Sequence, residues 1–200
     1  LKSIDNMGIQ FSNVDDRFFT NIVLSQTKPP TSGTREVKEV KALSMTANII
    51  TAPQVFRNHL DNSLEVFIQD SSLNAYLIDQ NFKPLWSIQL PFKIKNHVFQ
   101  IDYYNNEKLQ LAFISGNSFY IIDRKGTLLP GFPVQVSDLK TVNHFQVIDY
   151  DGSKNYRFSF SDDRGNLILT DKNGKVLKGW GSKKLESPLS QPLFHERIGK

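Results

Sequence analysis

Two stretches of this chain, 123–132 and 171–180, read DRKGTLLPGF and DKNGKVLKGW and lie 48 residues apart. Asp79 stands 44 residues before Asp123, and each of these aspartates follows a short apolar run and precedes a turn composition. A second series of markers has a similar spacing: Pro53, His97, His144 and Pro192. Self-similarity at a period of this length is typical of propellers, solenoids and other repeat architectures, and it constrains the fold more than any other feature of the chain.

Each repeat carries the pattern of β-strands. Apolar residues alternate along 64–69, 109–114 and 156–161, and a period of two predicts half-buried strands. A more uniformly apolar run follows in each repeat, as expected of a strand whose sheet is covered on both faces. The stretches between these runs, such as SDDRGN at 161–166, have the composition of turns. We therefore expect antiparallel strands joined by hairpins.

The repeated aspartates are interpreted as structural. Gly126 and Gly174 are predicted to take the left-handed conformation that closes a tight hairpin, while Asp123 and Asp171 cap the turn through their side-chain oxygens. The first repeat has Phe82 where glycine is expected, so its turn is predicted to differ.

Four antiparallel strands in roughly 45 residues are the signature of a β-propeller blade. The residues after each turn are expected to begin the fourth strand, in which Phe132 or Trp180 fills space between sheets. The predicted fold class is all-β, with almost no helix and with propeller blades of four antiparallel strands. Full blades are expected at 52–91, 95–138 and 142–187.

The two ends are expected to hold parts of further blades. Residues 1–44 are predicted to form a partial blade, an N-terminal hairpin followed by an outer strand at 35–43. Residues 45–200 are predicted to hold the three blades and the first strand of another, within 187–198. We expect an incomplete ring or a fragment of a larger propeller, although pairing between the two ends would instead close a four-bladed ring. The opening LKSIDNMG has neither initiator Met nor apolar leader, so any signal peptide is expected to lie outside this sequence.

Composition excludes several classes of function. No cysteine occurs, which excludes disulfides, thiolate catalysis and cysteine-based zinc sites. The 24 Lys and Arg residues are scattered among 20 Asp and Glu, and nucleic-acid binding needs basic residues clustered on one face, so no nucleic-acid partner is expected. No apolar run approaches the ~20 residues that a membrane helix requires. The catalytic motifs of serine hydrolases, zinc proteases and nucleotide-binding enzymes are also missing.

The repeat pattern resembles bacterial propeller repeats of the PQQ-like and FG-GAP-like type. The third repeat carries it best, with IDYDGSKNYRFSFSDDRGNLILTDKNGKVLKGW at 148–180. The resemblance covers 52–200 and implies the fold, but it says little about activity because propellers support unrelated functions.

Two chemistries implied by the resemblance are weighed against the residues. FG-GAP-like blades hold calcium in aspartate-rich loops, which makes Asp149 and Asp151 weak calcium candidates, but Lys154 in the same loop is a poor neighbour for a cation. Trp86 resembles the docking tryptophan of PQQ-dependent enzymes, yet the chain has only two Trp residues. Neither a metal nor a cofactor is therefore predicted.

The strands repeat while the loops between them differ in charge, and such loop variation is how binding specificity commonly arises. We expect a non-catalytic scaffold that binds protein, peptide or glycan, in the periplasm or cell envelope of a bacterium. Two alternatives stay open. One is a glycan-active hydrolase or lyase with carboxylates from different blades, for which Asp70, Asp102 and Asp149 are the candidates. The other is a purely structural spacer.

His97 and His144 hold the same place in successive blades, at the start of the inner strand. The connection between blades opens on the same face as the loop between the second and third strands. The two histidines are therefore predicted to share a binding face with Asp70, Asp162, Asp163 and Arg164. Paired imidazoles there could make binding pH-sensitive. The alternative is that each ring bonds to a backbone carbonyl and ties adjacent blades together.

Overall fold

The computed structural model describes residues 6–14, 17–25, 43–136, 138–180 and 183–196. The chain divides into two compact units, Leu1–Val40 and Lys41–Lys200, and each is described by itself. In the first unit, β1 (Asn6–Val14) pairs antiparallel with β2 (Arg17–Ser25). These strands agree with the predicted N-terminal hairpin. The outer strand predicted at 35–43 lies outside the described residues, apart from Leu43.

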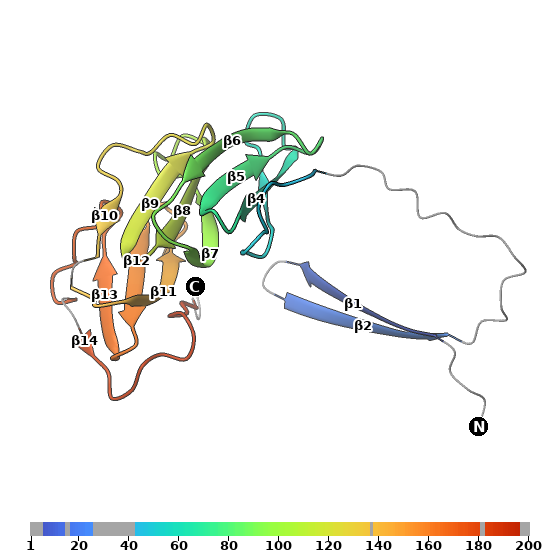
Figure 1. Cartoon of the computed structure of the whole chain (residues 1–200). Helices are drawn as coiled ribbons and strands as arrows, with labels where there is room; N and C mark the ends of the chain where they lie inside the picture. Colours follow the sequence, from blue (N-terminus) through green and yellow to red (C-terminus); the bar gives the residue numbers. More distant parts are fainter. Residues whose placement is uncertain (1–5, 15–16, 26–42, 137, 181–182, 197–200) are drawn as a thin grey trace, which may run out of the picture. The chain divides into compact units, whose positions relative to one another are not determined.

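The second unit contains three four-stranded antiparallel sheets in its described part (Figure 1). We call them blades 1, 2 and 3. Blade 1 consists of β3 (Gln54–Arg57), β4 (Leu64–Gln69), β5 (Asn74–Ile78) and β6 (Pro84–Gln89). Blade 2 consists of β7 (Ile94–Ile101), β8 (Gln110–Ser115), β9 (Ser118–Asp123) and β10 (Val134–Gln135). Blade 3 consists of β11 (Val142–Ile148), β12 (Arg157–Asp162), β13 (Asn166–Thr170) and β14 (Lys183–Lys184).

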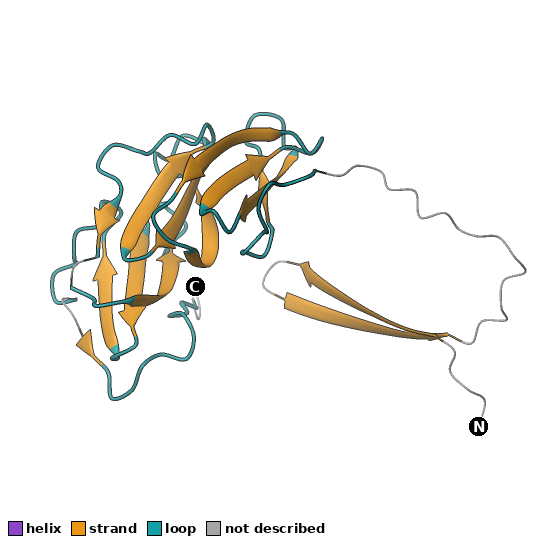
Figure 2. Cartoon of the chain, viewed as in Figure 1, coloured by secondary structure: helices purple, strands orange, loops and turns teal. Residues whose placement is uncertain are grey.

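Within each sheet the strands neighbour one another in chain order, so every blade is a continuous meander. Figure 2 shows strands and loops only, and the described residues contain no helix at all. The all-β fold built of four-stranded, propeller-type blades is therefore confirmed. Among the residues described, no helix exists that could span a membrane.

The hydrophobic core lies between the blades. Phe67 and Leu77 of blade 1 pack against Phe113 and Tyr120 of blade 2, and the last two rings stack with centroids 5.3 Å apart. Both faces of blade 2 are covered, because a second cluster fills its other side. It contains Ile114, Phe119, Ile121, Phe145, Phe158, Phe160 and Ile168. This two-sided burial explains why the central strands are apolar on both faces.

The turn between the third and fourth strands has the same structure in all three blades. Each aspartate Oδ1 accepts hydrogen bonds from the backbone N–H groups two and four residues later. These are Asp79 with Asn81 and Lys83 (2.8 and 2.9 Å), Asp123 with Lys125 and Thr127 (2.8 and 2.9 Å), and Asp171 with Asn173 and Lys175 (both 2.9 Å). The interpretation of these aspartates as turn caps is confirmed.

The turn of blade 1 does not differ, so that prediction was wrong. Phe82 has φ 64°, close to the 81° of Gly126 and Gly174. Its N–H donates to the Asp79 carbonyl at 3.0 Å, the same bond that Gly126 makes to Asp123. The capping bonds of Asp79 hold the backbone in this shape although a side chain there costs about 1–2 kcal/mol.

The fourth strands of blades 2 and 3 begin later than predicted. Leu128 and Val176 form only isolated bridges, and the strands start at Val134 and Lys183. Phe132 fills space as expected, with its ring 5.4 Å from that of Phe119. Trp180 does not, because 39% of it is exposed. It belongs to blade 3, beyond which the structure describes no further sheet.

Residues 187–196 contain no strand, so the first strand of a further blade is not seen in the described part of 187–198. Pro188 and Pro192 lack the N–H that a ladder needs. The segment instead lies against blade 3, where the His144 ring contacts the Leu189 carbonyl.

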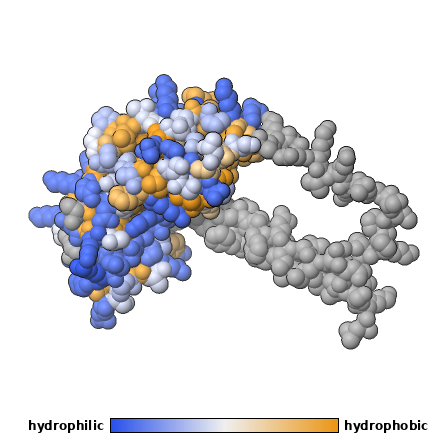
Figure 3. Space-filling model, in the orientation of Figure 1, coloured by the Kyte–Doolittle hydropathy of each residue, from blue (hydrophilic) through white to orange (hydrophobic). Residues whose placement is uncertain are grey.

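The face of blade 1 that points away from blade 2 is apolar and partly open. Its groove of about 410 Å³ is lined by Leu43, Met45, Ile49, Val55, Leu64, Val66 and Phe82, among others. Val55 and Leu64 are 60% and 58% exposed. Figure 3 shows apolar side chains of the second unit at its surface among hydrophilic ones.

Candidate functional site

The alternating strand directions sort the loops of every blade to two ends of the sheets. The end with the loops between second and third strands also holds the connections from one blade to the next, and we call it the connection face. The opposite end holds the other two hairpin loops of each blade, and we call it the hairpin face. Four of the six residues of the predicted binding set, Asp70, Asp162, Asp163 and Arg164, belong by topology to loops or strand ends on the connection face. The two histidines lie within β7 and β11, the inner strands that begin at this face.

Two of the predicted binding residues are turn caps with no free carboxylate oxygen. Asp70 accepts bonds from the Ser72 N–H (2.9 Å), the Asn74 N–H (2.9 Å) and the Tyr76 hydroxyl (2.8 Å). Asp162 accepts from the Arg164 N–H (2.9 Å) and from both nitrogens of Asn166 (2.8 and 2.7 Å). Each is 1% exposed. Neither side chain is therefore available to a ligand.

Burial opposes the charged form of both aspartates, but the hydrogen bonds outweigh it. The Tyr76 hydroxyl and two backbone N–H groups hold the pKa of Asp70 below its ordinary value. The Asn166 side chain and two backbone N–H groups do the same for the pKa of Asp162. Both carboxylates are thus ionised at neutral pH and serve to fix their turns.

Asp163 and Arg164 are exposed at the tip of the same turn in blade 3. The Lys184 ammonium donates to the Arg164 carbonyl. These two side chains are accessible, but blade 2 has only Gly116 and Asn117 at the corresponding turn. The charged tip is thus a feature of blade 3 and not of the repeat.

The two histidines have different surroundings. His97 is exposed on β7, its ring lies 4.9 Å from that of Phe99, and partial desolvation lowers its pKa. His144 is half-buried, and its Nε2 lies 2.9 Å from the Leu189 carbonyl oxygen. Its buried Nδ1 has no partner among the described residues. His144 thus matches the alternative of a bond to a backbone carbonyl, although that carbonyl belongs to the C-terminal segment and not to a neighbouring blade.

The inner strands of successive blades are joined by side chains that sequence reasoning missed. Lys95 Nζ donates to the Val142 carbonyl at 2.8 Å, and Asn96 Nδ2 donates to the Asn143 carbonyl at 2.7 Å. These bonds link residues 47 positions apart. The only feature of the sequence that pointed to these bonds is that Lys95 and Asn96 directly precede His97.

A groove of about 870 Å³ opens on the connection face at this junction. Three segments from blades 2 and 3 form it: 92–96, 116–118 and 141–143, together with Gln135. Its lining includes two lysines, Lys93 and Lys95, and no Asp or Glu. None of the six predicted binding residues lines it.

The Phe92 ring, 59% exposed, is seated directly on Gly116. A Cβ at Gly116 would lie 2.5 Å from Phe92 Cδ2, and the residue has φ +62°. The glycine therefore permits both the two-residue turn and the approach of the ring. The sequence SGNS at 115–118 predicts only a turn, so the contact between Phe92 and Gly116 could not be predicted from it.

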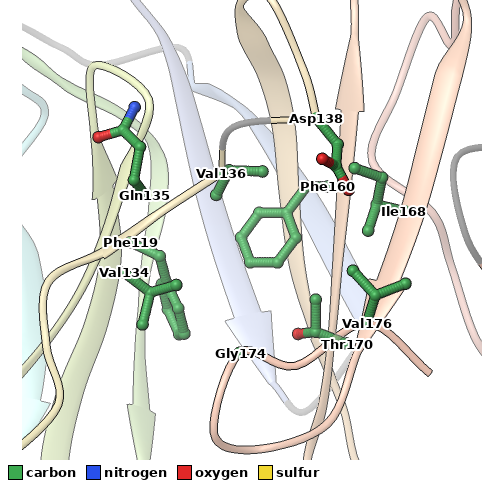
Figure 4. A pocket seen from close by; sticks show the side chains of 10 residues that line it. All are labelled: Phe119, Val134, Gln135, Val136, Asp138, Phe160, Ile168, Thr170, Gly174 and Val176. Carbon is green, nitrogen blue, oxygen red and sulfur yellow. The ribbon is translucent and has the colours of Figure 1, made fainter.

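A smaller cavity of about 120 Å³ lies between blades 2 and 3, next to Phe119, Phe160 and Ile168 (Figure 4). Val134 stands over Gly174 at its edge, and a Cβ there would lie 3.1 Å from Val134 Cγ1. We regard it as a packing space between sheets.

On the hairpin face, Asp102 and Lys154 form an ion pair. Lys154 Nζ lies 2.7 Å from Asp102 Oδ2, and Asp102 also accepts from the Asn106 and Glu107 N–H groups at 2.9 and 2.8 Å. Burial opposes the ionised form, but the Lys154 ammonium and these donors hold the pKa of Asp102 below its ordinary value.

The weak calcium candidates are engaged in the same loop. The Asp149 carboxylate accepts from the Lys154 N–H, and that of Asp151 accepts from the Ser153 N–H, both at 3.1 Å. Among the residues that the structure describes, no three metal-ligating side chains gather in one place. The Lys154 ammonium, which is paired with the Asp102 carboxylate, further disfavours a cation at this loop.

The three carboxylates considered for glycan hydrolysis are not brought together. Asp102 and Asp149 follow inner strands on the hairpin face, whereas Asp70 follows β4 on the connection face. A strand of six residues spans roughly 20 Å, and the carboxylates of a glycosidase must lie within about 5–9.5 Å of each other. Asp70 therefore cannot act in a pair with either of the others.

Comparison with known proteins supports the fold. No family model and no curated protein matches the sequence. A chain in a mercury-soaked crystal structure of BBS1N in complex with ARL6DN is similar with TM-score 0.50 and 11% identity, over 71% of this chain and 46% of that one. A lead-soaked crystal gives TM-score 0.49 and 13% identity, over 66% and 44%. A protein of unknown function from Bacteroides caccae gives 0.36 and 16%, over 62% and 43%.

The chain thus spans less than half the length of the solved chains it resembles. The likeness to the chain with TM-score 0.50, at 11% identity, concerns the fold alone, and it agrees with the three propeller-type sheets of the second unit.

Proposed function

We propose that this chain is a non-catalytic binding module of an extracytoplasmic bacterial protein, and that its ligand, a protein, peptide or glycan, occupies the groove on the connection face. The observation that carries the proposal is the groove itself. It is open, measures about 870 Å³ and is built from loop and strand-end segments of two blades, as ligand sites commonly are.

The way the groove is held supports a preformed site. Lys95 and Asn96 bond its two walls together across the junction between blades. Asn117 donates to the Leu139 and Lys140 carbonyls at 3.1 and 2.8 Å and accepts from the Val142 N–H at 2.9 Å. A site that keeps its shape without the ligand loses little conformational entropy on binding.

The enzymatic alternative has less support. Asp70 and Asp102 are buried caps with lowered pKa values, whereas a general acid needs a pKa raised toward the working pH. A partner protein is consistent with the similar BBS1N structure, which was crystallised in complex with ARL6DN.

Blocking the groove tests the proposal. Asn143 lines the groove, and its backbone carbonyl accepts a hydrogen bond from the Asn96 side chain. A change of the Asn143 side chain keeps this bond. Asn143→Trp therefore fills the groove without separating its walls. Tyr150→Trp is the matched control, since Tyr150 is 43% exposed on the hairpin face. Random peptides displayed on phage and a glycan array serve as probes.

We expect wild-type protein to select at least one peptide or glycan whose affinity falls tenfold or more with Asn143→Trp and stays the same with Tyr150→Trp. If no selected ligand distinguishes the two variants, the groove is not the binding site and the proposal fails.

A further inference from the structure

We infer that the ligand of this groove is an acidic peptide segment, bound extended with carboxylates on alternate residues. The inference rests on the proposed binding function and names its partner class. It follows from the two lysines of the connection that leads into blade 2.

The positive charge of the groove is uncompensated. Lys93 is exposed and has no ion-pair or hydrogen-bond partner among the described residues. The partner of the Lys95 ammonium is a neutral carbonyl, that of Val142. With no carboxylate in the lining, both ammonium groups are left to attract an anionic ligand.

Among the other polar side chains of the lining, Gln135 keeps a hydrogen-bond donor for a ligand. The Ser118 hydroxyl donates to Gln135 Oε1 at 2.9 Å, which leaves the amide nitrogen of Gln135 for a ligand. The oxygen and nitrogen of the Asn117 side chain are already used by backbone groups. A ligand rich in acceptors, as carboxylates are, fits this set.

The spacing of the lysines suggests the ligand's form. Lys93 and Lys95 are two residues apart, both line the groove, and β7 begins between them. Residues i and i+2 of an extended chain lie on one side, ~7 Å apart. An extended peptide with acidic residues at alternate positions repeats this spacing. The exposed Phe92 ring beside them can contact the aliphatic part of such side chains.

The probe is a fluorescein-labelled hexapeptide of alternating Glu and Ala, compared with the same peptide of Gln and Ala, by fluorescence anisotropy on the whole chain. Lys93→Gln removes an exposed charge, and Lys125→Gln, exposed on the hairpin face, is its matched control.

We expect the Glu peptide to bind, the Gln peptide to bind at least tenfold more weakly, and added salt to weaken binding. Lys93→Gln should raise the Kd about threefold to tenfold, with an unchanged melting temperature, while Lys125→Gln stays within twofold of the wild type.

Equal effects of Lys93→Gln and Lys125→Gln would overturn the inference, as would equal binding of the Glu and Gln peptides. Binding of a heparin-derived oligosaccharide, in place of the Glu peptide, would also overturn it. In each case a ligand displaced by Asn143→Trp would leave the proposed binding function standing, whereas the lack of any such ligand would remove both.

Discussion

The junction of blades 1 and 2 depends on one glycine beneath a tryptophan. Trp86 Nε1 donates to the Arg124 carbonyl at 2.7 Å, and the indole covers the turn that contains Gly126. Gly126 has φ +81°, and a Cβ there would lie 2.8 Å from Trp86 Cδ2. We predict that Gly126→Ala destabilises the second unit more than a glycine-to-alanine change at any unpacked turn.

The magnitude has two parts. An alanine in the left-handed region costs about 1–2 kcal/mol. Displacing a packed indole adds ~1–3 kcal/mol, typical of overpacking. Gly131 supplies the control, since it has φ +87° and nothing within 4 Å of the added Cβ. Gly131→Ala therefore carries the first cost only, and the difference between the two variants isolates the contact with Trp86.

The assay is urea unfolding at 25 °C, followed by circular dichroism and by tryptophan fluorescence. Typical domains are stable by about 5–15 kcal/mol, so both variants should remain folded enough to measure. Gly126→Ala should lose ~1–3 kcal/mol more than Gly131→Ala. In the background of Trp86→Leu, which removes the indole, the two alanine variants should cost nearly the same.

Equal losses for Gly126→Ala and Gly131→Ala in the wild-type background would refute this reasoning. It would mean that the indole does not rest on the turn, or that it moves away at no cost.

Three further predictions concern the turns and the C-terminal segment. Phe82→Gly should be more stable than Phe82→Ala by about 1 kcal/mol in urea unfolding, because residue 82 has φ 64° and alanine keeps the left-handed strain; equal stability would contradict that backbone conformation. The lowered pKa values of Asp70, Asp102 and Asp162 mean that their stabilisation is complete above the ordinary carboxyl pKa of 3.8 and is lost as the pH falls through the lower folded values. The urea concentration at the unfolding midpoint should therefore decrease as the pH is lowered below about 4. The decrease should be smaller in Asp162→Asn, and an equal decrease in that variant would count against the role of Asp162. His144→Phe removes the contact with the Leu189 carbonyl, which is worth about 1 kcal/mol. Limited proteolysis should therefore cut 185–196 faster in this variant than in the wild type. An equal rate of cleavage would show that this contact does not hold the segment.

Features set by local sequence could be predicted. The capping aspartates accept hydrogen bonds from N–H groups two and four residues later. The turns at Asp123 and Asp171 could therefore be predicted without any tertiary information. Strand β8 was recognisable from the alternation of apolar residues along 109–114, and strand β9 because it is apolar on both faces, which is what burial between two sheets requires.

Features set by the meeting of distant segments could not be predicted. The groove depends on the bond from Lys95 to the Val142 carbonyl and on the position of Phe92 over Gly116. Neither contact produces a periodic pattern in the sequence. Asp70 and Asp162 were expected to face a ligand because they occur in loops of the connection face. Their carboxylates instead satisfy the N–H groups of their own turns, which takes them away from solvent.

The failure at Phe82 has a different cause. Glycine is favoured in a left-handed turn because other residues adopt this conformation at a cost in free energy, but they are not excluded from it. The capping bonds of Asp79 and its neighbours in the hairpin outweigh that cost here, and Phe82 stays 47% exposed.

The chain-order pairing of strands within each blade also bears on how the second unit folds. In its described part every β-ladder joins strands that are consecutive in the sequence, and the side-chain bonds between inner strands span 43 to 47 residues. The loops that must close are therefore short for an all-β protein, and short loops close with a small entropic penalty. Each blade can form as a meander and then template the next, so folding is expected to spread from one repeat to its neighbour, as in linear repeat arrays.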